Sequence, residues 1–245
     1  MRLTTPATIL SLRPHGEHGA VVRMLTPDHG LQAAYVRGAT GRRMRPVLLA
    51  GNAVAANLAA RTEGQLPQAT VELLHSRATL LAEPLAAAGI DWVCALTATA
   101  LPEGQPYPAL YQAFDGLLSA IEAAPAASGW GAALVRFELL MLSQLGFGLD
   151  LDQCAVSGAT DDLIAVSPRS GRAVSAAAAK PYLGQLMMLP RFVREGGAAT
   201  WAEILDGLAL TGHFVRRDLL PDRAARIADA RERLIERLRR AAGVA

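Results

Sequence analysis

Several residue types are scarce in this chain of 245 residues, and each scarcity excludes a class of protein. Two cysteines, Cys94 and Cys154, are too few to build a disulfide framework. No run of about 18 apolar residues is free of charges and helix breakers, which argues against a membrane span. The N-terminus has no apolar core of signal-peptide length. We therefore expect a cytoplasmic protein with no membrane partner.

Catalytic motifs are scarce as well. The sequence has no GxxxxGK[ST] loop for nucleotide phosphates, no HExxH zinc motif and no GxSxG nucleophile elbow. Asp161 and Asp162 are adjacent, and consecutive residues on a strand face opposite sides, so a shared metal is not expected. In "HGEHG", His15 and His18 lie on a loop without a defined face, which favours a turn over a metal site with Asp28 or His29. We expect no enzyme, no metal and no cofactor.

Charge is distributed unevenly along the chain. Lys180 is the only lysine among 24 basic residues, so we do not interpret arginine over lysine at any one position as functional. Residues 1–61 carry a net charge of +6, residues 62–162 carry −10 and residues 163–245 carry +6, which together give the net +2. Basic ends around an acidic middle indicate different partners for different parts of the chain.

The first 80 residues are predicted to be β-rich. Short apolar or alternating runs are separated by turn-forming residues, and "TPDHG" is the clearest turn because Pro27 suits its second position and Gly30 its last. Five strands in about 75 residues match a small barrel, for which the oligonucleotide-binding fold is one candidate. The predicted strands are "ATILSL", "AVVRML", "LQAAYV", "AVAANL" and "ATVELLH".

Helical spacing of apolar residues begins after residue 80. The first run ends at Pro102, the second lies between Pro108 and Pro125, and the third is "GWGAALVRFELLMLSQLGFG". Residues 150–178 are polar and interrupted by glycine and proline, which predicts a β-hairpin insert with strands "LIAVS" and "RAVSA". Helical texture returns in "KPYLGQLMML", "TWAEILDGLALTGHFVRRDL" and "ARIADARERLIERLRRAA".

The candidate site is the loop "RGATGRRMRP", residues 37–46. Its glycines leave it free to bend, and its four arginines form a dense positive cluster that suits phosphates. The alternative is a solvated loop whose arginines serve solubility. The first domain has one aromatic residue, Tyr35, so tracking of the backbone fits better than stacking on bases. The candidate DNA-binding residues are Arg37, Arg42, Arg43, Arg45, Arg23 and Arg13, with Arg61 in the same domain.

Two segments make the chain similar to a known family. "LRPHGEHGAVVRMLTPDHGLQAAYVRGATGRR" resembles the opening of the RecO family of DNA repair and recombination mediator proteins. "RFELLMLSQLGFGLDLDQC" is similar to that family's helix that runs to a glycine and then a cysteine, here Gly146 and Cys154. The resemblance covers essentially the whole chain.

The resemblance implies an α+β multidomain protein with a barrel of the oligonucleotide-binding fold at 1–80. A helical domain would follow at 81–149 and 180–245, interrupted at 150–179 by a degenerate zinc-finger-like hairpin. It also implies binding to single- and double-stranded DNA, strand annealing, and work with RecR to load RecA onto DNA coated by single-stranded-DNA-binding protein. The place of action would be the bacterial cytoplasm, at the nucleoid.

One departure from the family pattern concerns zinc. Many members carry four cysteines in the insert, and here the second to fourth positions fall on Ser157, Ser175 and Ala178, beside Cys154. We therefore predict that the insert holds no metal and that Cys154 is a buried leftover thiol.

Several alternatives stay open. The basic loop could bind an acidic protein partner, which would make the chain an interaction scaffold. A nucleic-acid enzyme would require Asp28, His15 and His18 to gather around a cleft. The C-terminal arginines could form a docked amphipathic helix or a second nucleic-acid contact. The acidic and apolar tail of the coating protein could bind these basic terminal segments or Arg136.

Overall fold

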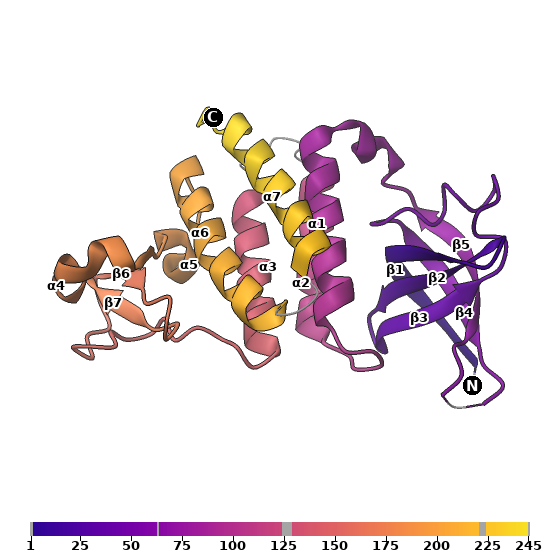
Figure 1. Ribbon diagram of the computed structural model, residues 1–245, viewed down its shortest axis with the longest axis horizontal. Helices are drawn as coiled ribbons and strands as arrows, with labels where there is room; N and C mark the ends of the chain where they lie inside the picture. Colours follow the sequence, from indigo (N-terminus) through magenta and orange to yellow (C-terminus); the bar gives the residue numbers. More distant parts are fainter. Residues whose placement is uncertain (1, 63, 124–128, 221–223, 245) are drawn as a thin grey trace. The chain divides into compact units, whose positions relative to one another are not determined.

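The computed structural model describes residues 2–62, 64–123, 129–220 and 224–244 (Figure 1). The chain divides into two compact units, Met1–Pro125 and Ala126–Ala245. Within the described ranges, no helix combines the length and the apolar character needed to cross a bilayer.

The first unit begins with a closed barrel in which the strands follow the order β1–β2–β3–β5–β4. The ring closes because the long strand β1 serves two neighbours: its first half pairs with β4 and its second half with β2. A parallel contact between β3 and β5 completes it. This is the five-stranded barrel of the oligonucleotide-binding fold, so that prediction is confirmed. The strands are β1 (Arg2–His15), β2 (Gly19–Thr26), β3 (Gly30–Val36), β4 (Ala53–Ala59) and β5 (Gln68–His75).

The barrel interior is filled by alternate residues of each strand. On β2, Val22 and Met24 are buried while Arg23 between them is only half-buried. On β4, Val54 and Leu58 are buried while Asn57 faces solvent. The period-2 pattern in the sequence therefore fixes which face of each strand points inward.

The "TPDHG" turn joins β2 to β3 as predicted. The Thr26 hydroxyl accepts a hydrogen bond from the His29 N–H at 3.2 Å and donates to the Gly30 carbonyl at 2.8 Å. Gly30 has a φ of +63°, and a Cβ there would lie 1.9 Å from the carbonyl oxygen of Gln105. Only glycine fits this position without displacing the backbone opposite.

Two long helices complete the first unit. After the short 3-10 helix η1 (Ala78–Ala82), α1 (Pro84–Ala100) buries Trp92 and Leu96, and α2 (Pro108–Ala123) buries Phe114. Each helix begins with proline, whose missing N–H costs nothing in a first turn. The predicted end of the first helical run at Pro102 is confirmed within two residues.

The second unit is built on three helices. These are α3 (Gly131–Gln144), α6 (Trp201–Phe214) and α7 (Ala224–Ala241), with the short α5 (Arg191–Glu195) beside them. Thr200 and Glu203 form a capping box at the start of α6. Helix α6 continues into a π-helical turn, η3 (Val215–Leu219). Helix α7 is the docked amphipathic helix, with Leu234 and Leu238 fully buried.

A buried ion pair connects these three helices. Glu138 on α3 is fully buried, and its carboxylate accepts a hydrogen bond from the Arg231 guanidinium of α7 at 3.0 Å and another from the Thr211 hydroxyl of α6. Arg231 can reach inward because α6 has Gly212 beside it: a Cβ there would lie 2.2 Å from an Arg231 nitrogen. The glycine is therefore required by the ion pair.

The predicted hairpin insert is a small sheet in the order β7–β6–β8. Strands β6 (Leu163–Val166) and β7 (Ala173–Ser175) match the two predicted strands, and the four-residue helix α4 (Ala176–Ala179) follows. The helical prediction for residues 180–189 is wrong at its end. A 3-10 helix, η2 (Lys180–Gln185), gives way to β8 (Met187–Met188), which pairs with β6. Pro181 and Gly184 disfavour a regular helix, and the open edge of β6 takes the following residues.

Candidate nucleic-acid interface

The arginine-rich loop is ordered. Residues 37–48, named here the arginine cap, form successive helical turns between β3 and β4. The Met44 and Arg45 N–H groups donate to the Gly41 carbonyl at 3.0 and 3.1 Å, and those of Val47 and Leu48 both donate to the Met44 carbonyl at 3.0 Å. These hydrogen bonds give the loop a defined series of turns, which the sequence pattern did not predict. Glycine is needed at Gly38, whose φ of +69° is left-handed.

The cap is amphipathic. Leu48 is buried in the barrel core, and Met44 and Val47 pack against the same core. Their three- and four-residue spacing places them on one side of the turns and leaves the arginines on the other. The cap therefore closes one end of the barrel and presents guanidinium groups to solvent. The four exposed arginines are Arg37, Arg42, Arg43 and Arg45.

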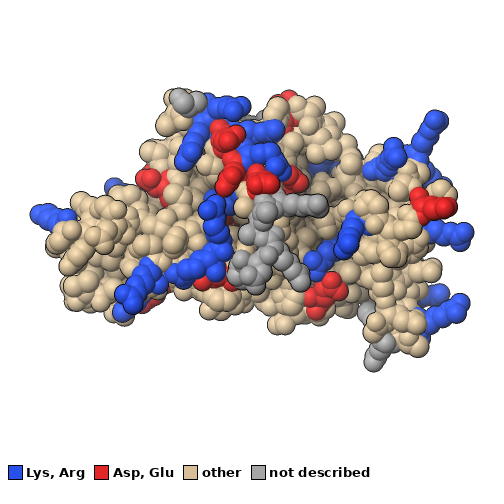
Figure 2. Space-filling view, viewed as in Figure 1, with Lys and Arg blue, Asp and Glu red and all other residues tan. Residues whose placement is uncertain are grey.

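A groove of about 780 Å³ runs between the cap and the barrel wall. Arg37, Arg43 and Met44 line it from the cap side, and Arg2 lies at its rim on β1. The opposite wall is polar and comes from β4 and β5, through Asn57, Gln68, Thr70 and Glu72. Figure 2 shows basic side chains projecting at several points around the barrel, with few acidic ones on the same face. The groove combines positive charge on its cap side with polar groups and one carboxylate, Glu72, on the opposite wall.

The four arginines of the cap share one property. None of them makes an ion pair or a side-chain hydrogen bond within the described part of the chain, so their charge is uncompensated. Arg13 is also exposed, on the hairpin that joins β1 to β2. Arg37 and Arg43 line the groove, whereas Arg42 and Arg45 extend the same positive surface beyond it.

Arg23 differs from the other candidate residues. Its guanidinium donates to the Ala98 carbonyl of α1 and to the Glu103 carboxylate at 2.9 Å. Its charge therefore ties β2 to the end of α1, and its guanidinium is less available to phosphate than those of the cap. This pairing has no local sequence signal, because the partners lie 75 and 80 residues further along the chain.

The prediction from sequence also missed some residues that line the groove. Arg2 lies far from the arginine cluster in sequence, and Gln68 and Thr70 occupy an ordinary alternating strand. Only the barrel closure brings them to the cap. Their outward positions on β5 were the one available signal.

The arrangement required for an enzyme is not seen among the described residues. His15 and His18 lie on the β1–β2 hairpin, and Asp28 lies on the β2–β3 turn, at the opposite end of β2. An eight-residue strand spans about 25 Å, too far for shared chemistry. No group of three metal-binding side chains occurs in the described ranges.

Three of the four insert positions that were compared with zinc-binding cysteines lie together: Cys154, Ser157 and Ser175. Cys154 is buried, and its sulfur accepts hydrogen bonds from the Ser175 hydroxyl and N–H at 3.4 and 3.3 Å and from the Ser157 N–H at 3.5 Å. Hydrogen bonds from Ser157 and Ser175 lower the pKa of Cys154 to about 6. The prediction that Cys154 is buried is confirmed, and the insert is held by this contact and by hairpin pairing.

Arg136, a candidate for binding an acidic tail, is engaged. It donates to the carbonyls of Phe192 and Gly197 at 3.3 and 3.1 Å and lies over the Phe192 ring. A groove of about 390 Å³ between α6 and α7 has exposed arginines instead. Its floor is apolar and its rim is charged, and it is lined by Leu205, Leu208, Ala209, Ile235, Arg216, Arg231, Arg239, Glu232 and Glu236.

A barrel of the oligonucleotide-binding fold with a basic cap is an arrangement typical of the class of nucleic-acid-binding proteins. Comparison with known protein families matches most of the chain to two family descriptions. The family described as Recombination protein O N terminal matches residues 1–77, and Recombination protein O C terminal matches residues 81–226. The chain belongs to the RecO family.

Full-length relatives agree with this assignment. The DNA repair protein RecO of Rhodospirillum centenum is 44% identical over 244 residues, which cover 98% of this chain and 96% of the relative. That of Phenylobacterium zucineum is 42% identical over 240 residues, covering 97% and 98%. That of Cereibacter sphaeroides is 41% identical over 234 residues, covering 95% and 96%. Membership of this family assigns the chain to DNA repair and recombination.

Proposed function

We propose that the chain is a recombination mediator that binds single- and double-stranded DNA through its barrel and anneals complementary strands. With RecR it would help load RecA onto DNA coated by single-stranded-DNA-binding protein. One observation carries the DNA-binding part: the cap arginines have no acidic partner in the described chain. By contrast, Arg23, Arg77 and Arg231 donate hydrogen bonds to carbonyls or carboxylates of the protein.

Uncompensated guanidinium groups on a fixed surface suit a phosphate backbone. Each contact releases a condensed counterion, so affinity depends on salt and little on sequence. Neutralising two strands at once also lowers their mutual repulsion, which favours annealing. No step requires covalent chemistry or a nucleotide.

The test is a salt series of binding to a labelled single-stranded oligonucleotide. The variant Arg42→Ala/Arg43→Ala/Arg45→Ala is compared with Arg169→Ala/Arg191→Ala/Arg194→Ala, which removes the same charge from exposed positions of the second unit. The slope of log affinity against log salt is roughly −0.7 per phosphate contacted. We expect the cap variant to bind more weakly and its slope to flatten by about two, while the control variant keeps the slope.

An unchanged slope in a folded cap variant would move the DNA contact elsewhere. The basic cap would then bind an acidic protein partner, the scaffold alternative. A short oligonucleotide separates the two functions, because it competes with an acidic partner only if both occupy the cap.

We also propose where the acidic tail of the coating protein binds: the α6–α7 groove. The apolar floor and the exposed Arg216 and Arg239 complement a peptide with acidic residues and an apolar tip. Within the described part of the chain, Arg216 makes an exposed ion pair with Glu232 at 3.5 Å.

A labelled synthetic peptide of that composition tests this site. We expect Arg239→Glu to weaken binding at least fivefold. The matched control is Arg240→Glu, one residue further on α7 and outside the groove lining. Equal effects of the two variants would show that general charge, and not the groove, attracts the peptide.

A further inference from the structure

A buried side chain lies beneath the last turn of the arginine cap. Asn52 is fully buried, and its Nδ2 donates to the carbonyls of Pro46 and Val47 at 2.8 and 3.2 Å. These carbonyls end the helical turns of the cap and have no onward helix to bond them. Asn52 therefore closes the cap in the way that a side chain caps a helix.

The Asn52 amide is itself held in one orientation. Its Oδ1 accepts the Arg77 N–H at 2.9 Å, so the amide nitrogen must face the two cap carbonyls. Its backbone carbonyl accepts the Ile9 N–H of β1 at 2.9 Å. The cap is thus fixed to the barrel strands and to the segment after β5.

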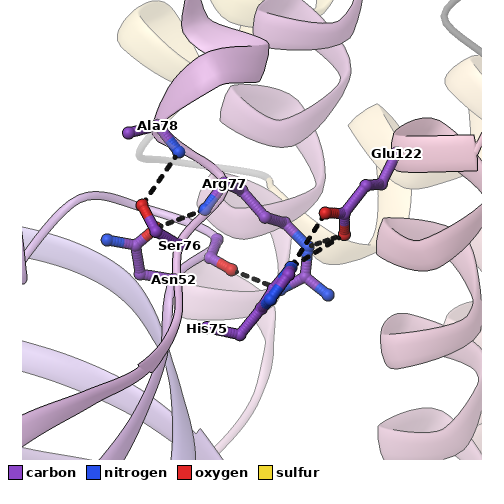
Figure 3. A network of polar contacts seen from close by, with 7 residues as sticks. Asn52, His75, Ser76, Arg77, Ala78 and Glu122 are labelled. Atoms are coloured by element: carbon purple, nitrogen blue, oxygen red, sulfur yellow. Dashed lines mark hydrogen bonds and ion pairs between the residues drawn. The ribbon is translucent and has the colours of Figure 1, made fainter.

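Arg77 carries this connection to helix α2 (Figure 3). Its guanidinium is buried and donates to the Gly51 carbonyl at 2.6 Å. Its Nε lies 3.3 Å from a Glu122 carboxylate oxygen, an ion pair that lacks the alignment of a hydrogen bond. His75 Nε2 lies 2.8 and 3.0 Å from the two oxygens of the same carboxylate. Glu122 therefore contacts both His75 and Arg77, and the second of these residues orients Asn52.

We propose that Asn52 is a positioning residue for DNA binding, and that Arg77 and Glu122 hold it in place. The network keeps the cap in its binding conformation before DNA arrives. This inference rests on the proposed function, because it concerns the same arginines. A cap that must order itself on binding has an affinity reduced by the fraction of molecules already ordered, while its contacts in the complex are unchanged.

The experiment uses the full chain and a labelled oligothymidylate of about 16 nucleotides, the upper site size of one such barrel. Asn52→Ala removes the amide, and Glu122→Gln removes charge at the half-exposed end of the network. The matched control, Thr211→Val, removes the hydroxyl that donates to Glu138 and accepts from Arg231 in the second unit. Affinity, salt slope and hydrogen exchange of the cap amides are measured for each variant.

We expect Asn52→Ala to bind about three- to tenfold more weakly with an unchanged salt slope. Its Met44, Arg45, Val47 and Leu48 amides should exchange faster, and bound DNA should restore their protection. Glu122→Gln should show the same pattern with a smaller change. If Asn52→Ala does not fold, Glu122→Gln decides. Thr211→Val should bind as the wild type does.

Three results would overturn the inference. The first is wild-type DNA affinity in Asn52→Ala and Glu122→Gln, and the second is an equal loss of affinity in Thr211→Val. The third is a salt slope in Asn52→Ala as flat as that of the triple arginine variant. The last would mean that the cap no longer contacts phosphate at all. If instead the triple arginine variant keeps the wild-type slope, the proposed DNA site itself has failed, and the two failures are distinguished.

Discussion

The buried ion pair of the second unit gives the sharpest stability prediction. Arg231→Ala removes a side chain that is 14% exposed and whose guanidinium donates to Glu138 at 3.0 Å and to the Leu208 carbonyl at 2.7 Å. The substitution leaves the fully buried Glu138 carboxylate without its guanidinium. Breaking a buried pair from one side costs about 3–5 kcal/mol, because the remaining charge is not resolvated.

The comparison lies on the same helix. Arg240 and Glu236 form an exposed pair at 3.9 Å, so Arg240→Ala should change stability by no more than about 0.5 kcal/mol. Native-state hydrogen exchange of α3 and α6 suits a chain of two units, since it reports each one separately. About 3 kcal/mol corresponds to roughly a hundredfold faster exchange. A change below tenfold in Arg231→Ala would refute the claim that the pair secures these helices. Adding Glu138→Gln should recover part of the loss.

Two further predictions concern single positions. Thiolate absorbance should appear as the pH rises through about 6, should vanish in Cys154→Ser and should persist in Cys94→Ser, because burial and Asp91 raise the pKa of Cys94 to about 12. Because folding lowers the pKa of Cys154 from 9.0, the thiolate contributes its full stabilisation of the fold above pH 9.0, and this contribution is lost as the pH falls through about 6. A wild-type chain that loses no more stability between these pH values than Cys154→Ser would contradict the lowered pKa. Gly30→Ala should lower the thermal stability of the first unit more than Gly38→Ala. Both residues have positive φ, but only at Gly30 would the new Cβ lie 1.9 Å from a backbone oxygen, that of Gln105. Equal losses of stability would mean that backbone strain alone decides the effect.

Local pattern predicted much of the fold. Strands β2 to β5 and helices α1, α2, α3, α6 and α7 are where alternation and helical spacing placed them, because each has one face that must be buried. Strand β1 contains its predicted segment but begins five residues earlier, at Arg2. β8 was missed because a two-residue strand has no period, and only the open edge of β6 makes it extended. The order of the arginine cap was missed for a related reason. Its apolar residues Met44, Val47 and Leu48 are few, and their helical spacing was hidden among arginines.

The candidate site was predictable as a cluster and unpredictable residue by residue. Four arginines within nine residues concentrate positive charge in one short segment, which the sequence alone shows. Whether an isolated arginine is available depends on what lies opposite it in the fold. Arg23 meets Glu103 and Arg136 meets two carbonyls, and neither contact has a local sequence signal. Availability of charge, the property that matters for phosphate, is therefore a tertiary property.

The single aromatic residue of the barrel bears on how annealing would proceed. The ring of Tyr35 packs across the barrel wall onto Gly19, where a Cβ would lie 2.0 Å from its hydroxyl oxygen, and it contacts His15 edge-on. Tyr35 is half-buried and also lines the groove, so the barrel offers one ring at most for stacking on a base. A strand held by the cap would then be bound mainly through its phosphates, with most of its bases not stacked on protein. Base edges left unoccupied can pair with a second strand, and neutralised phosphates let that strand approach. The lack of stacking residues, which weakens the case for a sequence-reading protein, thus favours one that anneals.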